Sequence, residues 1–200
     1  MQFPFPSRVI ESFQSALEGM GLQLMISVQM SPEEYVRRYQ EIEWPVLDVC
    51  PVCGAHARLQ GHGSYSRNAL PNRDTELVAP VHRLRCPVCR RTVSLLPSFL
   101  LPYFQHTAKF VVESLLGKAR SYRELLRFHW RRFLVNANRV LAFLRDLGVR
   151  ERLPDGEKER AMKLLGSIED SGLEMFSTLF HRLNRRGFMA DSSYLLRTSG

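Results

Sequence analysis

Hydrophobic residues recur at helical spacing near both ends of the chain, whereas its middle follows a different pattern. In residues 7–20 apolar side chains fall every three or four positions, and residues 22–28 alternate as a strand does. A capping box from Ser31 to Glu34, with proline in the first helical position, predicts a helix that runs to about Ile42. The beginning of the chain is therefore expected to be mainly helical.

The middle of the chain, residues 48–102, is rich in proline and glycine. Residues 82–85 and 92–96 have the composition and alternation of short, half-exposed strands. Pro97 and Pro102 exclude a continuous helix at the end of this segment. We expect short strands joined by turns here.

After the second strand candidate the helical spacing returns and predicts three successive helices. The first ends near Gly117, the second spans residues 121–129 behind a capping box, and the third ends at Gly148. Asn136 or Asn138 is expected to cap the third helix. These lengths suit a helix-turn-helix unit whose third helix enters the major groove of DNA, and a plain three-helix bundle is the alternative.

Four cysteines form two near-identical Cys-x-x-Cys motifs, with 32 residues between the second and the third cysteine. Tetrahedral zinc takes four soft ligands, and a Cys-x-x-Cys turn presents two thiolates to one ion. Gly54 permits the positive φ that such a turn often uses. The spacing predicts a zinc ribbon with one structural Zn²⁺, held by Cys50, Cys53, Cys86 and Cys89. Because protein ligands fill all four positions, a catalytic zinc is not expected.

Other interpretations of the cysteines remain open. A rubredoxin-like iron site would use the same ligands, whereas a thioredoxin-like redox pair would need a flanking βαβ pattern that the sequence lacks. Three histidines near the motifs are alternative ligands: His56, His62 and His82. Disulfides are not expected, because the sequence has no membrane-length apolar run and no secretory signal at its start, which predicts a cytoplasmic protein.

These elements together predict an α+β protein in four parts. They are an N-terminal helical segment (1–47), a small zinc ribbon (48–102), a helix-turn-helix-like unit (103–150) and C-terminal helices with a tail (151–200). Within the last part, helices are expected over residues 157–168 and 173–186, with Gly172 between them.

Positive charge is concentrated in the middle of the chain. The net charge is +8 overall, but it is −4 in residues 1–49, +12 in residues 50–153 and 0 in residues 154–200. A localised basic excess is typical of a nucleic-acid-binding surface, and a solvated basic face is the alternative. The predicted DNA contacts are Arg83, Arg85, Arg90 and Arg91 on the ribbon, and Arg123, Arg127, Arg131, Arg132, Asn138 and Arg139 on the helices.

Three segments carry a family resemblance beyond the cysteine spacing. They are His-Gly-Ser-Tyr at 62–65, Arg-Leu-Arg-Cys-Pro-Val-Cys-Arg-Arg-Thr at 83–92 and Leu-Leu-Pro-Ser-Phe at 95–99. This region resembles the zinc-ribbon region at the front of many bacterial insertion-sequence transposases. It is more closely similar to a group of short, uncharacterised bacterial proteins associated with mobile elements. The resemblance covers roughly residues 48–130, and it implies DNA binding in a transposition setting.

No catalytic site is expected. Transposase nucleases hold two metal ions with three spaced carboxylates on a mixed sheet, and the residues after the third helix are too few and too helical to form one. The sequence therefore predicts a zinc-dependent DNA-binding protein, and the resemblance implies that it is an accessory protein or regulator of a bacterial mobile element. The alternative is a protein–protein adaptor whose ribbon docks on a larger recombinase or transposase.

Overall fold

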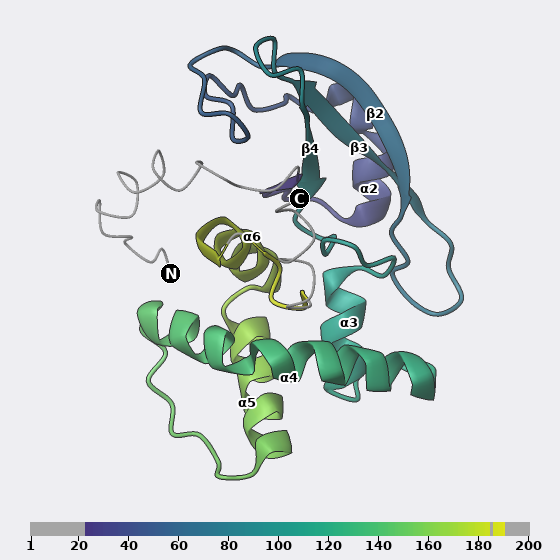
Figure 1. Cartoon of the computed structure of the whole chain (residues 1–200). Coiled ribbons are helices and arrows are strands. Elements are labelled where there is room, and N and C mark those ends of the chain that lie inside the picture. The colour runs from purple at the N-terminus through teal and green to yellow at the C-terminus, as the bar shows by residue number, and fades with distance from the viewer. Residues whose placement is uncertain (1–22, 185, 191–200) are drawn as a thin grey trace.

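The computed structural model describes residues 23–184 and 186–190, so the helix expected over 7–20 lies outside the described residues. The described chain has a mixed α/β architecture, a four-stranded sheet with five α-helices (Figure 1). The strands are β1 (Gln23–Ile26), β2 (Gln60–Asn68), β3 (Val78–Arg85) and β4 (Thr92–Pro97). The helices are α2 (Pro32–Arg37), α3 (Ala108–Leu115), α4 (Arg123–Asp146), α5 (Glu157–Asp170) and α6 (Leu173–Asn184), with a 3-10 helix η2 (Tyr39–Glu41). None of the helices in this part of the chain is both long and apolar enough to span a bilayer.

The sheet has the order β1-β4-β3-β2. Strands β2, β3 and β4 are antiparallel neighbours, and β1 runs parallel to β4 with Gln23 opposite Ser94. The strands predicted at 22–28, 82–85 and 92–96 are confirmed as β1, β3 and β4. Strand β2 was not predicted individually, because its largely exposed run of glycines and polar residues has no apolar alternation.

Helix α2 packs against the sheet and begins as expected. The Ser31 hydroxyl accepts a hydrogen bond from the Glu34 backbone N–H at 3.1 Å. The α-helix ends at Arg37 rather than Ile42, although the 3-10 helix η2 adds a further helical turn that ends at Glu41. The hydroxyl of the fully buried Tyr35 donates a hydrogen bond to the carbonyl of Pro80 at 2.8 Å, and this bond joins α2 to β3.

Helices α3 to α6 enclose a second apolar core. Phe143 of α4 makes edge-on contacts with Phe176 and Phe180 of α6, at ring-centroid distances of 5.3 and 5.4 Å. Gly172 has a φ of +82° and turns the chain sharply from α5 into α6. The two helices expected over 157–168 and 173–186 are confirmed.

The expectation of two separate helices between residues 121 and 147 is wrong, because α4 is continuous from Arg123 to Asp146. The connection expected at 130–135 is helical, and the helix contains neither glycine nor proline. Asn136 does not cap a helix: its buried amide donates to the carbonyls of Arg132 at 2.9 Å and Ala190 at 2.6 Å. The expected capping box at Ser121 is also absent, since Tyr122 is the N-cap and has no side-chain capping bond. The predicted three-helix form of the helix-turn-helix unit is therefore not present in the described residues.

Ser98 joins the sheet to the helical core. Its hydroxyl oxygen accepts a hydrogen bond from the Val28 backbone N–H at 3.1 Å, and the hydroxyl donates to the Glu174 carboxylate at 2.8 Å. The end of β4, the segment after β1 and the start of α6 therefore meet at one buried serine. This junction ties the sheet to the start of α6.

Candidate metal centre and basic surfaces

The two cysteine motifs adopt the same backbone turn, which we call a knuckle. In the first knuckle, the N–H of Cys50 donates to the carbonyl of Ala55 and the N–H of Gly54 donates to the carbonyl of Cys50, both at 2.9 Å. The second knuckle has the same pair of bonds at 3.0 Å, from Cys86 to Arg91 and from Arg90 to Cys86. The repeated sequence therefore produces a repeated structure.

The knuckles bring the four cysteine sulfurs together. All four Sγ atoms lie within 4.8 Å of one another, with 3.8 Å between Cys50 and Cys89 and 3.9 Å between Cys53 and Cys86. Four sulfurs at about 2.3 Å from a tetrahedral ion are about 3.8 Å apart, whereas a disulfide requires about 2 Å. The arrangement therefore fits a metal ion. Among the described residues, no other group of three or more His, Cys, Asp or Glu is placed to hold one.

The four thiols have different surroundings. Cys50 and Cys86 are buried, Cys89 is half-buried and Cys53 is exposed. Burial raises the pKa of the Cys50 thiol to about 12, whereas the backbone N–H of Cys89, donating to the sulfur of Cys86 at 3.5 Å, lowers the pKa of Cys86 to about 7. A bound cation ionises coordinating thiols, because its positive charge stabilises the thiolates in place of the water that burial removes.

The histidines considered as alternative ligands are not part of this cluster. His82 instead stacks on Trp44 with 4.4 Å between ring centroids, and His56 lies in a backbone bridge to Val49. His62 lies on β2.

The ribbon arginines lie at the knuckle end of the sheet. Arg83 and Arg85 share one face of β3, because side chains alternate along a strand. Arg85 donates from Nε to the carbonyl of Arg90 at 3.3 Å, which links this face to the second knuckle. Arg85, Arg90 and Arg91 are exposed and Arg83 is half-buried.

The helical DNA-contact candidates all lie on the single helix α4. Arg132 is half-buried, with its guanidinium carbon 4.9 Å from the centre of the Phe128 ring. The others, Arg123, Arg127, Arg131, Asn138 and Arg139, are exposed. Figure 1 places α4 and the knuckle loops at opposite ends of the molecule, so the ribbon arginines and the α4 arginines form two surfaces rather than one.

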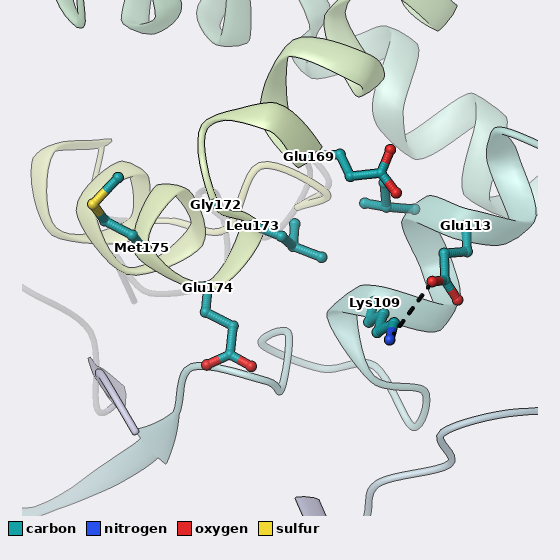
Figure 2. Close-up of a pocket in the computed structure, with 8 residues that line it drawn as sticks. Lys109, Glu113, Glu169, Gly172, Leu173, Glu174 and Met175 are labelled. Atoms are coloured by element: carbon teal, nitrogen blue, oxygen red, sulfur yellow. Dashed lines mark ion pairs between the residues drawn. The ribbon is translucent and has the colours of Figure 1, made fainter. Parts of the chain in front are cut away.

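Figure 2 shows a pocket of about 320 Å³ between α3, α5 and the start of α6. Its three glutamates each have a polar partner: Glu113 pairs with Lys109, Glu169 with Lys118 and Glu174 with Ser98. Leu173 and Val112 supply apolar lining. These partnered carboxylates do not point to a particular ligand.

Sequence reasoning missed three exposed aromatic side chains, one in the turn between β4 and α3 and two near the start of α4. Tyr103, Tyr122 and Phe128 are 67%, 54% and 40% exposed. Aromatic residues in apolar surroundings are usually buried, so the sequence predicts a core position for Phe128, and its exposure shows that prediction to be wrong. The pair Pro102-Tyr103 was the available hint, since a proline often occupies the second position of a tight turn.

The comparisons with known proteins concern this central region. Residues 50–125 match a domain of unknown function, DUF6431. The matched region contains both knuckles, strands β2 to β4, helix α3 and the start of α4. No curated protein and no solved structure matches the chain.

Proposed function

We propose that this protein binds DNA through the exposed face of α4, and that one zinc ion held by Cys50, Cys53, Cys86 and Cys89 stabilises the ribbon. The role of the zinc is structural: it supplies a fourfold crosslink between the two knuckles. Few metals other than zinc bind well to a set of four thiolates. The ligand set therefore supports zinc as the bound metal.

The observation that carries DNA binding is the composition of the exposed face of α4. Solvent-exposed side chains recur every three or four residues along the helix, at Phe128, Arg131, Val135, Asn138, Ala142 and Arg145. Arginines flank this stripe, and the helix has no acidic residue between Glu124 and Asp146. Arginine and asparagine recognise base edges in the major groove, while apolar side chains contact thymine methyl groups. A helix face that combines these groups is more typical of a DNA-recognition helix than of a surface whose charges serve only solubility.

The geometry favours α4 as a single long reading helix over a compact helix-turn-helix unit. Helix α3 precedes α4, but residues 116–122 between them make a longer connection than the usual three- or four-residue turn. In this proposal the ribbon arginines, at the other end of the molecule, contact phosphates, which carry no sequence information. In keeping with the transposase resemblance, we propose that the protein is a DNA-binding accessory factor or regulator of a mobile element without a catalytic site of its own.

One observation favours the alternative, a protein–protein adaptor. Val88, at the tip of the second knuckle, is 63% exposed, as an apolar anchor for a larger recombinase or transposase would be. Binding to that partner without affinity for DNA would support the adaptor and contradict our proposal.

The test is the salt dependence of DNA binding by the full zinc-loaded chain. Fluorescence anisotropy with a labelled random duplex should give a steep decrease of affinity with salt, because each phosphate contact releases about 0.9 counterion. The double variant R127Q/R131Q, and separately R83A/R85A, should lower the slope of log K against log salt by about one to two. The matched control, R37Q/K158Q, removes two exposed charges from α2 and α5 and should leave the slope unchanged. An equal slope in all four proteins would contradict the assignment of these surfaces.

A further inference from the structure

Between β4 and α3 the chain makes a sharp turn, Leu101–Phe104, that gives Tyr103 an unusual backbone conformation. The N–H of Phe104 donates to the carbonyl of Leu101 at 3.2 Å, and Tyr103 has a φ of +69°. With Pro102 in the second position, these are the features of a type II turn, whose third position normally holds glycine. A tyrosine in that position is strained, because its Cβ crowds the backbone.

Arg67 of β2 holds this turn in place. Its guanidinium donates hydrogen bonds to the carbonyls of Leu101 and Phe104, at 2.6 and 2.8 Å. Strained backbone persists only where the surrounding structure fixes it. Yet the side chain positioned in this way does not fill the core, since Tyr103 is 67% exposed. A strained and fixed aromatic ring on the surface points to a role outside the fold.

Two more exposed aromatic residues lie near the beginning of α4, and each has an arginine over its ring. The guanidinium carbon of Arg73 is 4.1 Å from the ring centre of Tyr122, and that of Arg132 is 4.9 Å from the ring centre of Phe128. Such cation–π contacts hold the rings in place and put positive charge beside them. Among the described residues, Tyr103, Tyr122 and Phe128 are the exposed large aromatic side chains.

Contacts between the segments bring these residues to one side of the molecule. Phe104, which follows Tyr103, packs on Phe128 with ring centroids 5.9 Å apart. The loop that carries Arg73 is tied to the turn region by the backbone N–H of Leu70, which donates to the carbonyl of Gln105 at 2.9 Å. Figure 1 shows the β2–β3 loop, α3 and the N-terminal end of α4 together on this side. We call Tyr103, Tyr122, Phe128, Arg73 and Arg132 the aromatic patch.

We propose that the aromatic patch binds unpaired DNA bases, next to the duplex that α4 contacts; this inference rests on the proposed function. Flat rings flanked by arginines are the elements with which proteins hold single-stranded nucleic acid, by stacking on bases and attracting the backbone. In a paired duplex the base faces are covered by neighbouring bases, so an aromatic ring on the protein surface selects bases that are unpaired. The acidic residues nearby are few: Asp74 and Glu76 lie in the Arg73 loop, and Glu124 pairs with Arg127 at 3.7 Å.

The test compares three DNA probes with the full zinc-loaded protein: a paired duplex, the same duplex with a central unpaired bubble, and a bubble whose unpaired nucleotides are abasic. The abasic bubble keeps the phosphates and removes the bases. We expect the bubble with bases to bind about 5- to 150-fold more tightly than the abasic bubble, the effect of stacking about one base. An RNA strand that binds more tightly than DNA of the same sequence would overturn the assignment to DNA.

Variants separate stacking from folding. Y122L should remove the preference for the bubble while duplex affinity stays the same. F128L should lower the ratio of bubble affinity to duplex affinity, whereas Y103F should retain the preference, because the ring rather than the hydroxyl stacks. Y103G should lose affinity for the bubble although its melting temperature is unchanged or higher, since glycine relieves the strain. The control V135A removes an exposed apolar side chain without a ring and should not change the preference for the bubble.

The possible failures are distinguishable. Normal duplex binding with no preference for the bubble in any protein would overturn this inference and leave the proposed function intact. A lower melting temperature of Y103G would show that the tyrosine serves the fold and would also overturn it. Absence of binding to all three probes would remove both proposals.

Discussion

Gly54 and Arg90 occupy equivalent positions in the two knuckles, and both have a positive φ, 69° at Gly54 and 59° at Arg90. Each residue follows the second cysteine of its motif and donates its N–H to the first cysteine's carbonyl. Glycine adopts a positive φ without strain, whereas arginine does not. The first knuckle is therefore unstrained at this position and the second is strained.

This difference gives opposite predictions for two substitutions. G54A should destabilise the ribbon by about 1–2 kcal/mol, because alanine is strained at a positive φ although its Cβ would meet no neighbouring atom. R90G should not destabilise it. Chemical denaturation of the zinc-loaded proteins measures both effects. G61A is the control, since Gly61 also has open space around its Cβ but no positive φ; an equal loss in G54A and G61A would contradict the explanation.

The second prediction concerns metal removal. C86S should abolish stoichiometric zinc, because three ligands bind a structural zinc far more weakly than four. Elemental analysis should find one zinc per wild-type chain, and cobalt substitution should give a tetrahedral thiolate spectrum. Far-ultraviolet circular dichroism should retain most helical signal in C86S, since α3 to α6 have a core of their own.

The control for this experiment is V88S, which changes an exposed side chain inside the same knuckle and should keep its zinc. Iron in the purified protein, or no metal under reducing conditions, would refute the assignment of zinc.

The third prediction concerns acid. His129 and His181 are buried, and burial lowers the pKa of each imidazole to about 4. In the unfolded chain both protonate near pH 6.5, so the unfolded state binds more protons between pH 6.5 and 4. The free energy of unfolding should therefore be highest above pH 6.5 and fall as the pH is lowered, by up to about 3 kcal/mol per histidine.

Urea denaturation of wild type and H129L at pH 7 and pH 5 isolates one of these histidines. Within the described residues neither ring nitrogen of His129 has a hydrogen-bond partner, so leucine should cost little stability at pH 7. H129L should lose less stability than wild type on acidification. Because both proteins carry the same cysteine cluster, acid release of metal cancels in the comparison; equal losses would refute the prediction.

The fourth prediction concerns the reading role of α4. N138Q and R139K should change sequence preference in a selection experiment, because a lost bidentate base contact costs about 1–3 kcal/mol of discrimination. R123Q and R127Q, nearer the start of the helix, should change only overall affinity. A supporting role for α4 predicts no altered preference in any of the four, and damage only from core changes such as L144A, which costs about 2–5 kcal/mol.

Local signals in the sequence predicted much of this structure. The Cys-x-x-Cys repeats predicted the sulfur cluster, because each motif builds its own turn. The Ser31 cap and Gly172 were equally informative, since a cap and a positive φ depend on neighbouring residues alone. These features need no knowledge of the rest of the chain.

Features that depend on distant contacts were not predictable in the same way. Asn136 has the propensity of a cap, but its amide hydrogen-bonds to Ala190, a residue 54 positions away, and the helix continues through it. Strand β2 has no apolar pattern because it lies at the edge of the sheet with most of its residues exposed. The strained Tyr103 is fixed by Arg67, which no local pattern reveals.

The parallel pairing of β1 with β4 has a consequence for the order of folding. Strand β1 leaves the ribosome before the other strands, but its hydrogen-bonding neighbour in the sheet is β4, which follows the second knuckle. The β2–β3 and β3–β4 pairs close short loops and should form early, whereas joining β1 to β4 closes a much longer loop and should be slow. Because α6 also packs against β1, through contacts such as Ser177 with Met25, this edge strand gains its helical cover only after α6 has been synthesised.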